Sequence, residues 1–180
     1  MSNNVVKLTV LSIAVLLTGC TSVNWKATLD KRLPEYGHRN WIVIADSAYP
    51  RQSAAGIETI YTGAGQLEVL QQVLAAVDNA DHVQPIIMLD AELESVPEAD
   101  APGVDAYRAE LKQLLGDRPV KAMTHEDIIR KLDEASKLFN VLLLKTDLTI
   151  PYTSVFIELD CGYWGPKKEQ KLRNIINTKR

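Results

Sequence analysis

The chain has 180 residues and a formal net charge of −3, which is long enough for one domain with a sizeable core and the wrong sign for a nucleic-acid-binding surface. Its two cysteines and three histidines show no local spacing typical of metal ligands. Composition therefore disfavours a nucleic-acid-binding protein and a metal or redox protein.

Residues 1–19 form a candidate export signal. Lys7 is their only charged residue, and the run from Leu8 to Leu17 is almost wholly apolar but shorter than the roughly 20 residues that span a bilayer. The run ends in Leu17-Thr18-Gly19-Cys20, which resembles the lipobox of bacterial lipoproteins. The resemblance implies cleavage before Cys20 and lipid on its sulfur. The alternative is an uncleaved anchor helix with a chance cysteine.

Lipidation at Cys20 implies a domain held outside the cytoplasm, on the outer membrane in a Gram-negative host because Thr21 follows the cysteine. Only Cys161 then remains, so no intrachain disulfide is expected. We predict a tether over residues 20–30, a folded domain over 31–165 and a basic tail over 166–180. Such basic runs are usually solvated, and contact with anionic lipid is the alternative.

Strands and helices alternate along the rest of the chain. A first helix is expected near Trp25, and the acidic segment Glu92–Asp105 is expected to be a loop. Thr124 is a candidate helix N-cap. Apolar spacing predicts strands over residues 41–46, 57–61, 85–90, 120–123, 141–144 and 155–159, and helices over 67–77, 104–115 and 124–132. The order predicts one three-layer α/β/α domain with a mixed, mostly parallel sheet.

A histidine and a carboxylate flank the first predicted strand. His38 precedes the strand and Asp46 ends it, at the sheet edge where ligands usually bind in layered α/β folds. A histidine beside a carboxylate can move protons near neutral pH. We therefore expect both groups to face one cavity. The alternative is structural: a loop that satisfies its own hydrogen bonds and an aspartate that caps a helix.

Four segments resemble one family of sugar-ring isomerases. Gly37-His38 followed by Ala45-Asp46 and Pro50 resembles the opening motif of the D-ribose pyranase and L-fucose mutarotase family. Thr124-His125-Glu126 resembles the pyranase branch, Tyr107-Arg108 resembles the fucose branch, and Pro151-Tyr152 precedes the last apolar strand as in the family. The resemblance spans roughly His38 to Leu159.

The resemblance implies a cofactor-free protein that binds a free monosaccharide near subunit contacts in a homo-oligomeric ring, often a decamer. His38 becomes the catalytic acid/base and Asp46 its partner, while His125 and Tyr152 become sugar contacts. Ser154 and Tyr49 are further candidate sugar contacts. Ring opening and closing requires only positioned proton donors and acceptors.

Two positions depart from the family pattern. The family usually has Tyr-x-Asn where this chain has Tyr152-Thr153-Ser154, and the pyranase branch has a lysine where this chain has Ile129. A serine reaches less far than asparagine and lacks its two-ended amide. The leading hypothesis is a lipid-anchored mutarotase or pyranase. The alternative is a non-catalytic sugar-binding or structural envelope protein.

The other candidate residues have mostly structural interpretations. His82 is expected on a surface loop, and Trp41 in the core rather than stacked on a sugar. Trp164 could stack on a sugar face. Glu92 and Glu94 are candidates for the mouth of the site or for a solvated loop.

Overall fold

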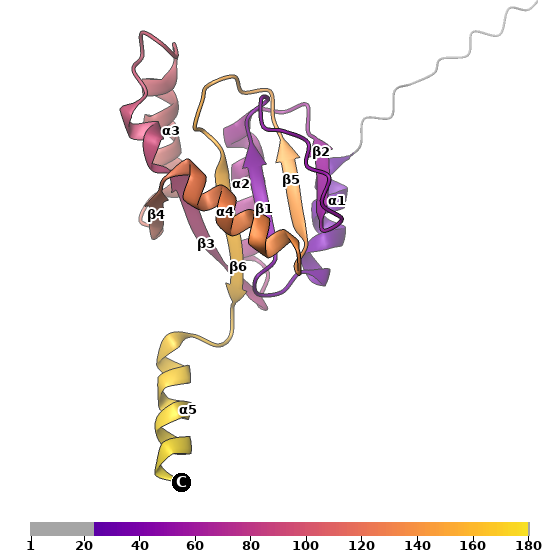
Figure 1. Cartoon of the computed structure of the whole chain (residues 1–180), viewed down its shortest axis with the longest axis vertical. Helices are drawn as coiled ribbons and strands as arrows, with labels where there is room; N and C mark the ends of the chain where they lie inside the picture. Colours follow the sequence, from indigo (N-terminus) through magenta and orange to yellow (C-terminus); the bar gives the residue numbers. More distant parts are fainter. Residues whose placement is uncertain (1–23, 180) are drawn as a thin grey trace, which may run out of the picture.

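The computed structural model describes residues 24–179, so the predicted signal peptide and the lipidation of Cys20 lie outside the described residues. Six strands form one sheet in the order β2-β5-β1-β6-β3-β4 (Figure 1). The strands are β1 (Trp41–Ala45), β2 (Ile57–Tyr61), β3 (Val83–Asp90), β4 (Val120–Met123), β5 (Val141–Lys145) and β6 (Val155–Cys161).

The sheet is mixed and mostly parallel, as predicted. β1 and β2 pair parallel to β5, and β3 pairs parallel to β4, whereas β6 runs antiparallel to both β1 and β3. The carboxyl ends of β1 and β3 therefore meet the amino end of β6 at one edge of the sheet. We call this the carboxyl edge, and the opposite edge the amino edge.

Helices cover both faces of the sheet. One face carries α1 (Trp25–Arg32), α2 (Gln66–Asp78) and α3 (Val104–Leu115), and the other carries α4 (His125–Ser136). Two short 3₁₀ helices, η1 (Leu33–Glu35) and η2 (Ala91–Ser95), follow α1 and β3, and α5 (Pro166–Thr178) ends the described chain. The three-layer α/β/α prediction is confirmed.

The central strands are apolar throughout because helices bury both of their faces. In β1, Ile42 and Ile44 face α2, while Trp41, Val43 and Ala45 belong to the cluster beneath α4. All five side chains of β1 are at most 1% exposed. Trp41 is thus a core residue, as expected.

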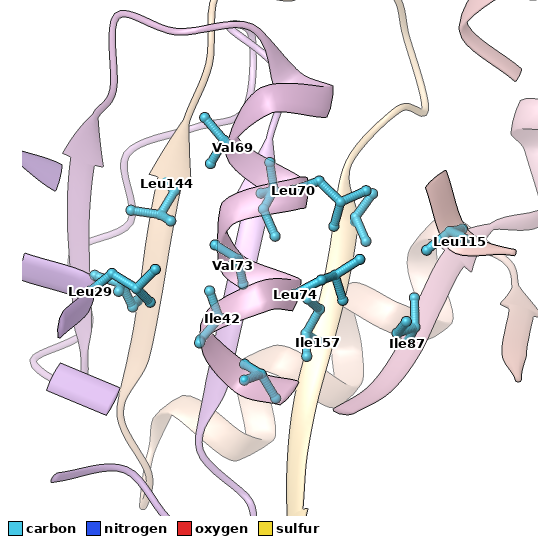
Figure 2. Close-up of a cluster of buried hydrophobic side chains, with 14 of the residues drawn as sticks. Leu29, Ile42, Val69, Leu70, Val73, Leu74, Ile87, Leu115, Leu144 and Ile157 are labelled. Atoms are coloured by element: carbon cyan, nitrogen blue, oxygen red, sulfur yellow. The ribbon is translucent and has the colours of Figure 1, made fainter. Parts of the chain in front are cut away.

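The larger core lies between α2 and the sheet. Figure 2 shows Val69, Leu70, Val73 and Leu74 of α2 directed at the strands, where they meet side chains such as Ile42. Burying an aliphatic side chain of this size stabilises the fold by about 1.5–3 kcal/mol. Among the described residues, every member of the two core clusters lies between Trp25 and Leu159, so α5 takes no part in the core.

Local signals placed most of the helices correctly. The apolar spacing predicted over 67–77 is α2, and Thr124 caps α4 by accepting a hydrogen bond from the Asp127 backbone N–H. Gly116 ends α3 with a φ of 56°, a left-handed conformation that favours glycine.

One predicted boundary is wrong, and two other predicted segments contain helical structure. The tether over residues 20–30 runs into α1, because Trp25 and Leu29 are buried in the core and make this helix part of the domain. The segment Glu92–Asp105 contains η2, whose Leu93 is 2% exposed. The basic tail over 166–180 is mostly helical, as α5. Over residues 24–179, no helix is both long enough and apolar enough to cross a membrane.

Candidate active site

The first acidic group at the carboxyl edge is Asp46, directly after β1. Its Oδ2 accepts a hydrogen bond from the Ser154 hydroxyl at 3.0 Å, and its Oδ1 accepts one from the Ala48 backbone N–H at 2.8 Å. Ser154 lies just before β6 and is 1% exposed. The carboxylate is therefore held in a fixed orientation at the end of the strand, and it remains half-buried rather than enclosed.

The second acidic group is Asp90, the last residue of β3. Its Oδ2 lies 3.0 Å from Nδ1 of His125, the first residue of α4. The Asp90 side chain is fully buried, whereas that of His125 is 37% exposed. Oδ1 of Asp90 has no hydrogen-bond partner among the residues that the structure describes. A buried carboxylate thus supports an imidazole that is partly exposed at the carboxyl edge.

The pKa of Asp90 is shifted toward neutral pH. Burial raises the pKa of Asp90 to about 6, because water no longer solvates the charged form, although the hydrogen bond with His125 opposes the shift. The negative charges of Glu92 and Asp46 raise this pKa further. A group that titrates near pH 6 suits proton transfer at physiological pH.

The backbone around His125 is fixed by Glu92. Both carboxylate oxygens of Glu92, in η2, lie 3.0 Å from the backbone N–H of His125. An acid at a helix amino terminus is favoured by the helix dipole and by the unsatisfied N–H groups there. Glu92 therefore positions the start of α4 at the rim of the site.

Tyr152 completes this group of side chains. Its ring stands edge-on to that of His125, with centroids 5.8 Å apart and an interplanar angle of 79°. Tyr152 has a φ of 59°, a left-handed conformation that costs a bulky residue free energy, and its side chain is exposed. Strain of this kind persists only where the surrounding structure enforces it.

A buried polar network enforces that conformation. The Thr153 carbonyl oxygen accepts hydrogen bonds from Gln66 Nε2 at 2.5 Å and from the Tyr107 hydroxyl at 2.8 Å. Gln66 Oε1 accepts a hydrogen bond from the Thr146 hydroxyl at 2.6 Å. Gln66 and Thr153 are at most 3% exposed. The first residues of α2 and a residue of α3 therefore hold the loop that presents Tyr152 and Ser154.

The structure brings four of the six predicted site residues together. Asp46, His125, Tyr152 and Ser154 lie at the carboxyl edge, where Val155 of β6 pairs with both Ile44 of β1 and Leu89 of β3. Because neighbouring strands are about 4.8 Å apart, the backbones of Asp46 and Asp90 are separated by roughly 10 Å.

Tyr49 lies behind this group rather than on its surface. It is 5% exposed and packs against Phe156, with ring centroids 6.3 Å apart. Burial raises the pKa of its hydroxyl. The prediction of Tyr49 as a direct sugar contact is therefore not supported by its position, because its ring packs on Phe156 in the core cluster beneath α4.

His38 lies at the other end of β1. It occupies the exposed turn at the amino edge, next to Arg39, whose backbone N–H donates to the Leu159 carbonyl at 2.8 Å. β1 alone separates the two edges by roughly 13 Å at 3.3 Å per residue. The expectation that His38 and Asp46 face one cavity is therefore wrong within one chain: an extended strand carries its flanking residues to opposite edges.

His82, expected on a surface loop, has a structural role. His82 Nε2 lies 3.1 Å and 3.0 Å from the carbonyl oxygens of Leu33 and Tyr36, so this histidine ties η1 to the start of β3 and is only partly exposed. Asp90 was missed as a site residue. Its signal in the sequence was an aspartate ending a buried strand, the same signal that singled out Asp46.

Over residues 24–179 no group of three or more histidine, cysteine or acidic side chains is arranged to hold a metal ion.

Sequence comparison assigns the domain. The model of a family described as the RbsD / FucU transport protein family matches residues 25–159. The chain belongs to this family. The family predicted from the short motifs is therefore confirmed, and its domain begins at α1 and ends in β6. No curated protein matches the chain by sequence.

Solved structures share the RbsD/FucU fold at low sequence identity. The RbsD of Bacillus subtilis in complex with D-ribose is 16% identical, with a TM-score of 0.53 over 83% of this chain and 98% of that chain. A fucose mutarotase from Streptococcus pneumoniae in complex with L-fucose is 21% identical, with a TM-score of 0.50 over 79% and 97% of the two chains. FucU from Bifidobacterium longum is 18% identical, with a TM-score of 0.51 over 74% and 94%.

Proposed function

We propose that this RbsD/FucU domain binds a free monosaccharide at the carboxyl edge and catalyses the opening and closing of the sugar ring. The observation that carries the proposal is the exposed His125 imidazole supported by the buried Asp90 carboxylate, with the second carboxylate, Asp46, on the far side of β6. Solved relatives of the same fold hold D-ribose and L-fucose.

The proton chemistry follows from the hydrogen bonds. Above pH 6 the Asp90 carboxylate only accepts, so the hydrogen that it shares with His125 belongs to Nδ1, and in the neutral ring the lone pair is on Nε2. Nε2 then removes the proton of the anomeric hydroxyl, and the bond from the anomeric carbon to the ring oxygen breaks. The ring oxygen takes a proton from an acid on the opposite side of the sugar. Closure from either face, or from another hydroxyl, returns both protons.

A neighbouring copy supplies the second histidine in this proposal. His38 is exposed at the amino edge and cannot reach Asp46 of its own chain, whereas the carboxyl edge is open, with Tyr152 40% exposed. A ring of copies that sets the amino edge of one against the carboxyl edge of the next would place His38 beside Asp46. We propose such a homo-oligomer, carried on a lipid at Cys20.

The direct test is exchange spectroscopy by NMR on D-ribose, L-fucose and related free sugars. We expect the protein to accelerate interconversion of ring forms and His125→Gln to reduce the acceleration by about 10²–10⁴. Glu134→Gln, an exposed residue far along the same helix, should leave it unchanged. Exchange rates that the protein does not alter for any sugar, or that His125→Gln does not change, would contradict catalysis.

The interface is tested by mixing variants. His38→Ala and Asp46→Asn are each expected to be inactive alone, whereas their mixture should regain part of the activity, because mixed rings contain some sites with both groups intact. Absence of recovery in re-assembled mixtures would refute the shared site. Titration calorimetry distinguishes the non-catalytic alternative: sugar binding without exchange would identify a binding protein in which Ser154 replaces the family's asparagine.

A further inference from the structure

The C-terminal helix α5 lies outside the RbsD/FucU domain. The family match ends at residue 159, and the structural relatives are covered almost completely, at 94–98%, by only 74–83% of this chain. Figure 1 shows α5 standing away from the sheet beyond the end of β6. No residue of α5 is buried.

The segment between β6 and α5 contacts the domain at Gly162, and after that residue it contacts α5. A Cβ at Gly162 would lie 2.6 Å from the Asp81 carbonyl oxygen and 2.8 Å from that of Val83, so the chain leaves the sheet through a contact that only glycine allows. Beyond it, Trp164 Nε1 donates to Glu169 Oε2 at 2.7 Å and Lys168 Nζ donates to the Tyr163 carbonyl at 2.8 Å. The segment before the helix is thus fastened to α5 itself.

One side of α5 carries an exposed aliphatic stripe. Leu172, Ile175 and Ile176 follow the i, i+3, i+4 spacing of a single helix face and are 38%, 45% and 38% exposed. Lys168 and Lys179 lie one turn from either end of the stripe. Lysine stems can cover apolar surface while their ammonium groups reach outward to phosphates.

The charge of this segment is opposite to that of the body. Residues 166–180 contain six basic residues and one acid, Glu169, whose charge is already paired with Arg173 at 2.6 Å. Because the whole chain carries −3, the remainder is more acidic than the total. The body is therefore repelled by an anionic surface, and α5 is the part of the described chain suited to approach one.

A second copy fits the stripe less well. Two α5 helices set face to face would bring like charges together at both ends of the stripe, and three aliphatic side chains offer far less than the roughly 800 Å² per partner of a stable interface. An interfacial helix on a membrane needs only a modest apolar face with cations around it.

We propose that α5 is a membrane-docking helix that lies on an anionic phospholipid surface, with Leu172, Ile175 and Ile176 in the acyl boundary and its lysines on lipid phosphates. The proposal is independent of the sugar site. It also fits the predicted anchor, because the few residues between Cys20 and Trp25 span at most about 18 Å and would keep the domain near the bilayer.

The test is vesicle co-sedimentation of the chain from Thr21 onward, which lacks any lipid anchor but keeps both described core clusters. Phosphatidylcholine vesicles containing about a third phosphatidylglycerol should bind it, pure phosphatidylcholine vesicles much less, and raised salt should release it. Trp164 is 42% exposed, whereas Trp25 and Trp41 are at most 5% exposed, so a blue shift of fluorescence on binding reports the end of α5.

Matched variants separate the two parts of the contact. Lys167→Gln with Lys171→Gln should weaken binding roughly fivefold for each charge removed, whereas Lys112→Gln with Lys121→Gln removes the same charge from the body and should change it little. Leu172→Ser with Ile176→Ser should weaken binding at least tenfold while leaving urea unfolding unchanged, since neither residue is buried.

Equal binding by the Lys167/Lys171 and Lys112/Lys121 pairs of variants, or no binding to anionic vesicles, would overturn the proposal. If the protein does not bind lipid and the mass of its assembly in solution falls when Leu172 and Ile176 are replaced, α5 makes contacts between copies instead.

Discussion

Each edge of the sheet carries a histidine whose ring is held by hydrogen bonds, and the two rings have different hydrogen-bond partners. At the carboxyl edge, His125 bonds the buried carboxylate of Asp90 through Nδ1. At the amino edge, His82 bonds two backbone carbonyl oxygens through Nε2. A carboxylate can exchange a proton with the ring it contacts, whereas a carbonyl group can only accept a hydrogen bond from the ring. The partner, rather than the histidine itself, indicates which edge can move protons.

Replacing Asp90 should have the largest effect on activity. Asp90→Asn keeps the shape of the side chain but removes the charge that supports His125, so we expect sugar-ring exchange to fall by about 10²–10⁴. Exchange spectroscopy on the sugar that proves active provides the measurement. Unchanged exchange in Asp90→Asn would remove the distinction between the two histidines.

The same substitution should change how stability depends on pH. The folded pKa of Asp90 is about 6, above its ordinary value, so the stability that this carboxyl contributes is complete below about pH 4 and is lost as pH rises through 6. Relative to Asp90→Asn, the wild-type free energy of unfolding should fall by about 2–3 kcal/mol between pH 4 and pH 7. Urea unfolding at several pH values measures this difference, and parallel curves would contradict the buried, shifted carboxyl.

Removing the brace at the amino edge should affect stability alone. His82→Ala frees the carbonyl groups of Leu33 and Tyr36 and should cost about 1–3 kcal/mol of unfolding free energy. Sugar-ring exchange per folded molecule should stay at the wild-type rate. Loss of exchange without loss of stability would show that His82 has a chemical role.

The smallest of these effects is expected at the loop that presents Tyr152. Gln66→Leu removes one of the two donors to the Thr153 carbonyl and should cost about 1–2 kcal/mol. Because the loop then holds Tyr152 and Ser154 less firmly, we expect weaker sugar affinity with a largely retained maximal rate. Tyr107→Phe removes the other donor and serves as the matched variant; an unchanged affinity in both would show that the network is structural only.

Most of the architecture could be predicted from local patterns. The apolar runs of β1 and β5 and the spacing along α2 state directly which residues are buried. The boundary before α1 was misplaced because Trp25 and Leu29 show their role only through contacts with distant strands. The position of α5 was equally hidden, since its composition indicates solvent exposure but not that it stands apart from the body.

The residues of the site likewise fall into those that local sequence patterns predict and those that only contacts between distant segments reveal. Sequence alone determined the family, the acidic ends of the strands and the candidates Asp46, His125, Tyr152 and Ser154, because each belongs to a short motif. Only the tertiary structure decided that Asp90 supports His125 and that His38 lies at the opposite edge. Such pairings depend on which strands are neighbours and which way each runs, and strand order is fixed by contacts between segments far apart in the chain.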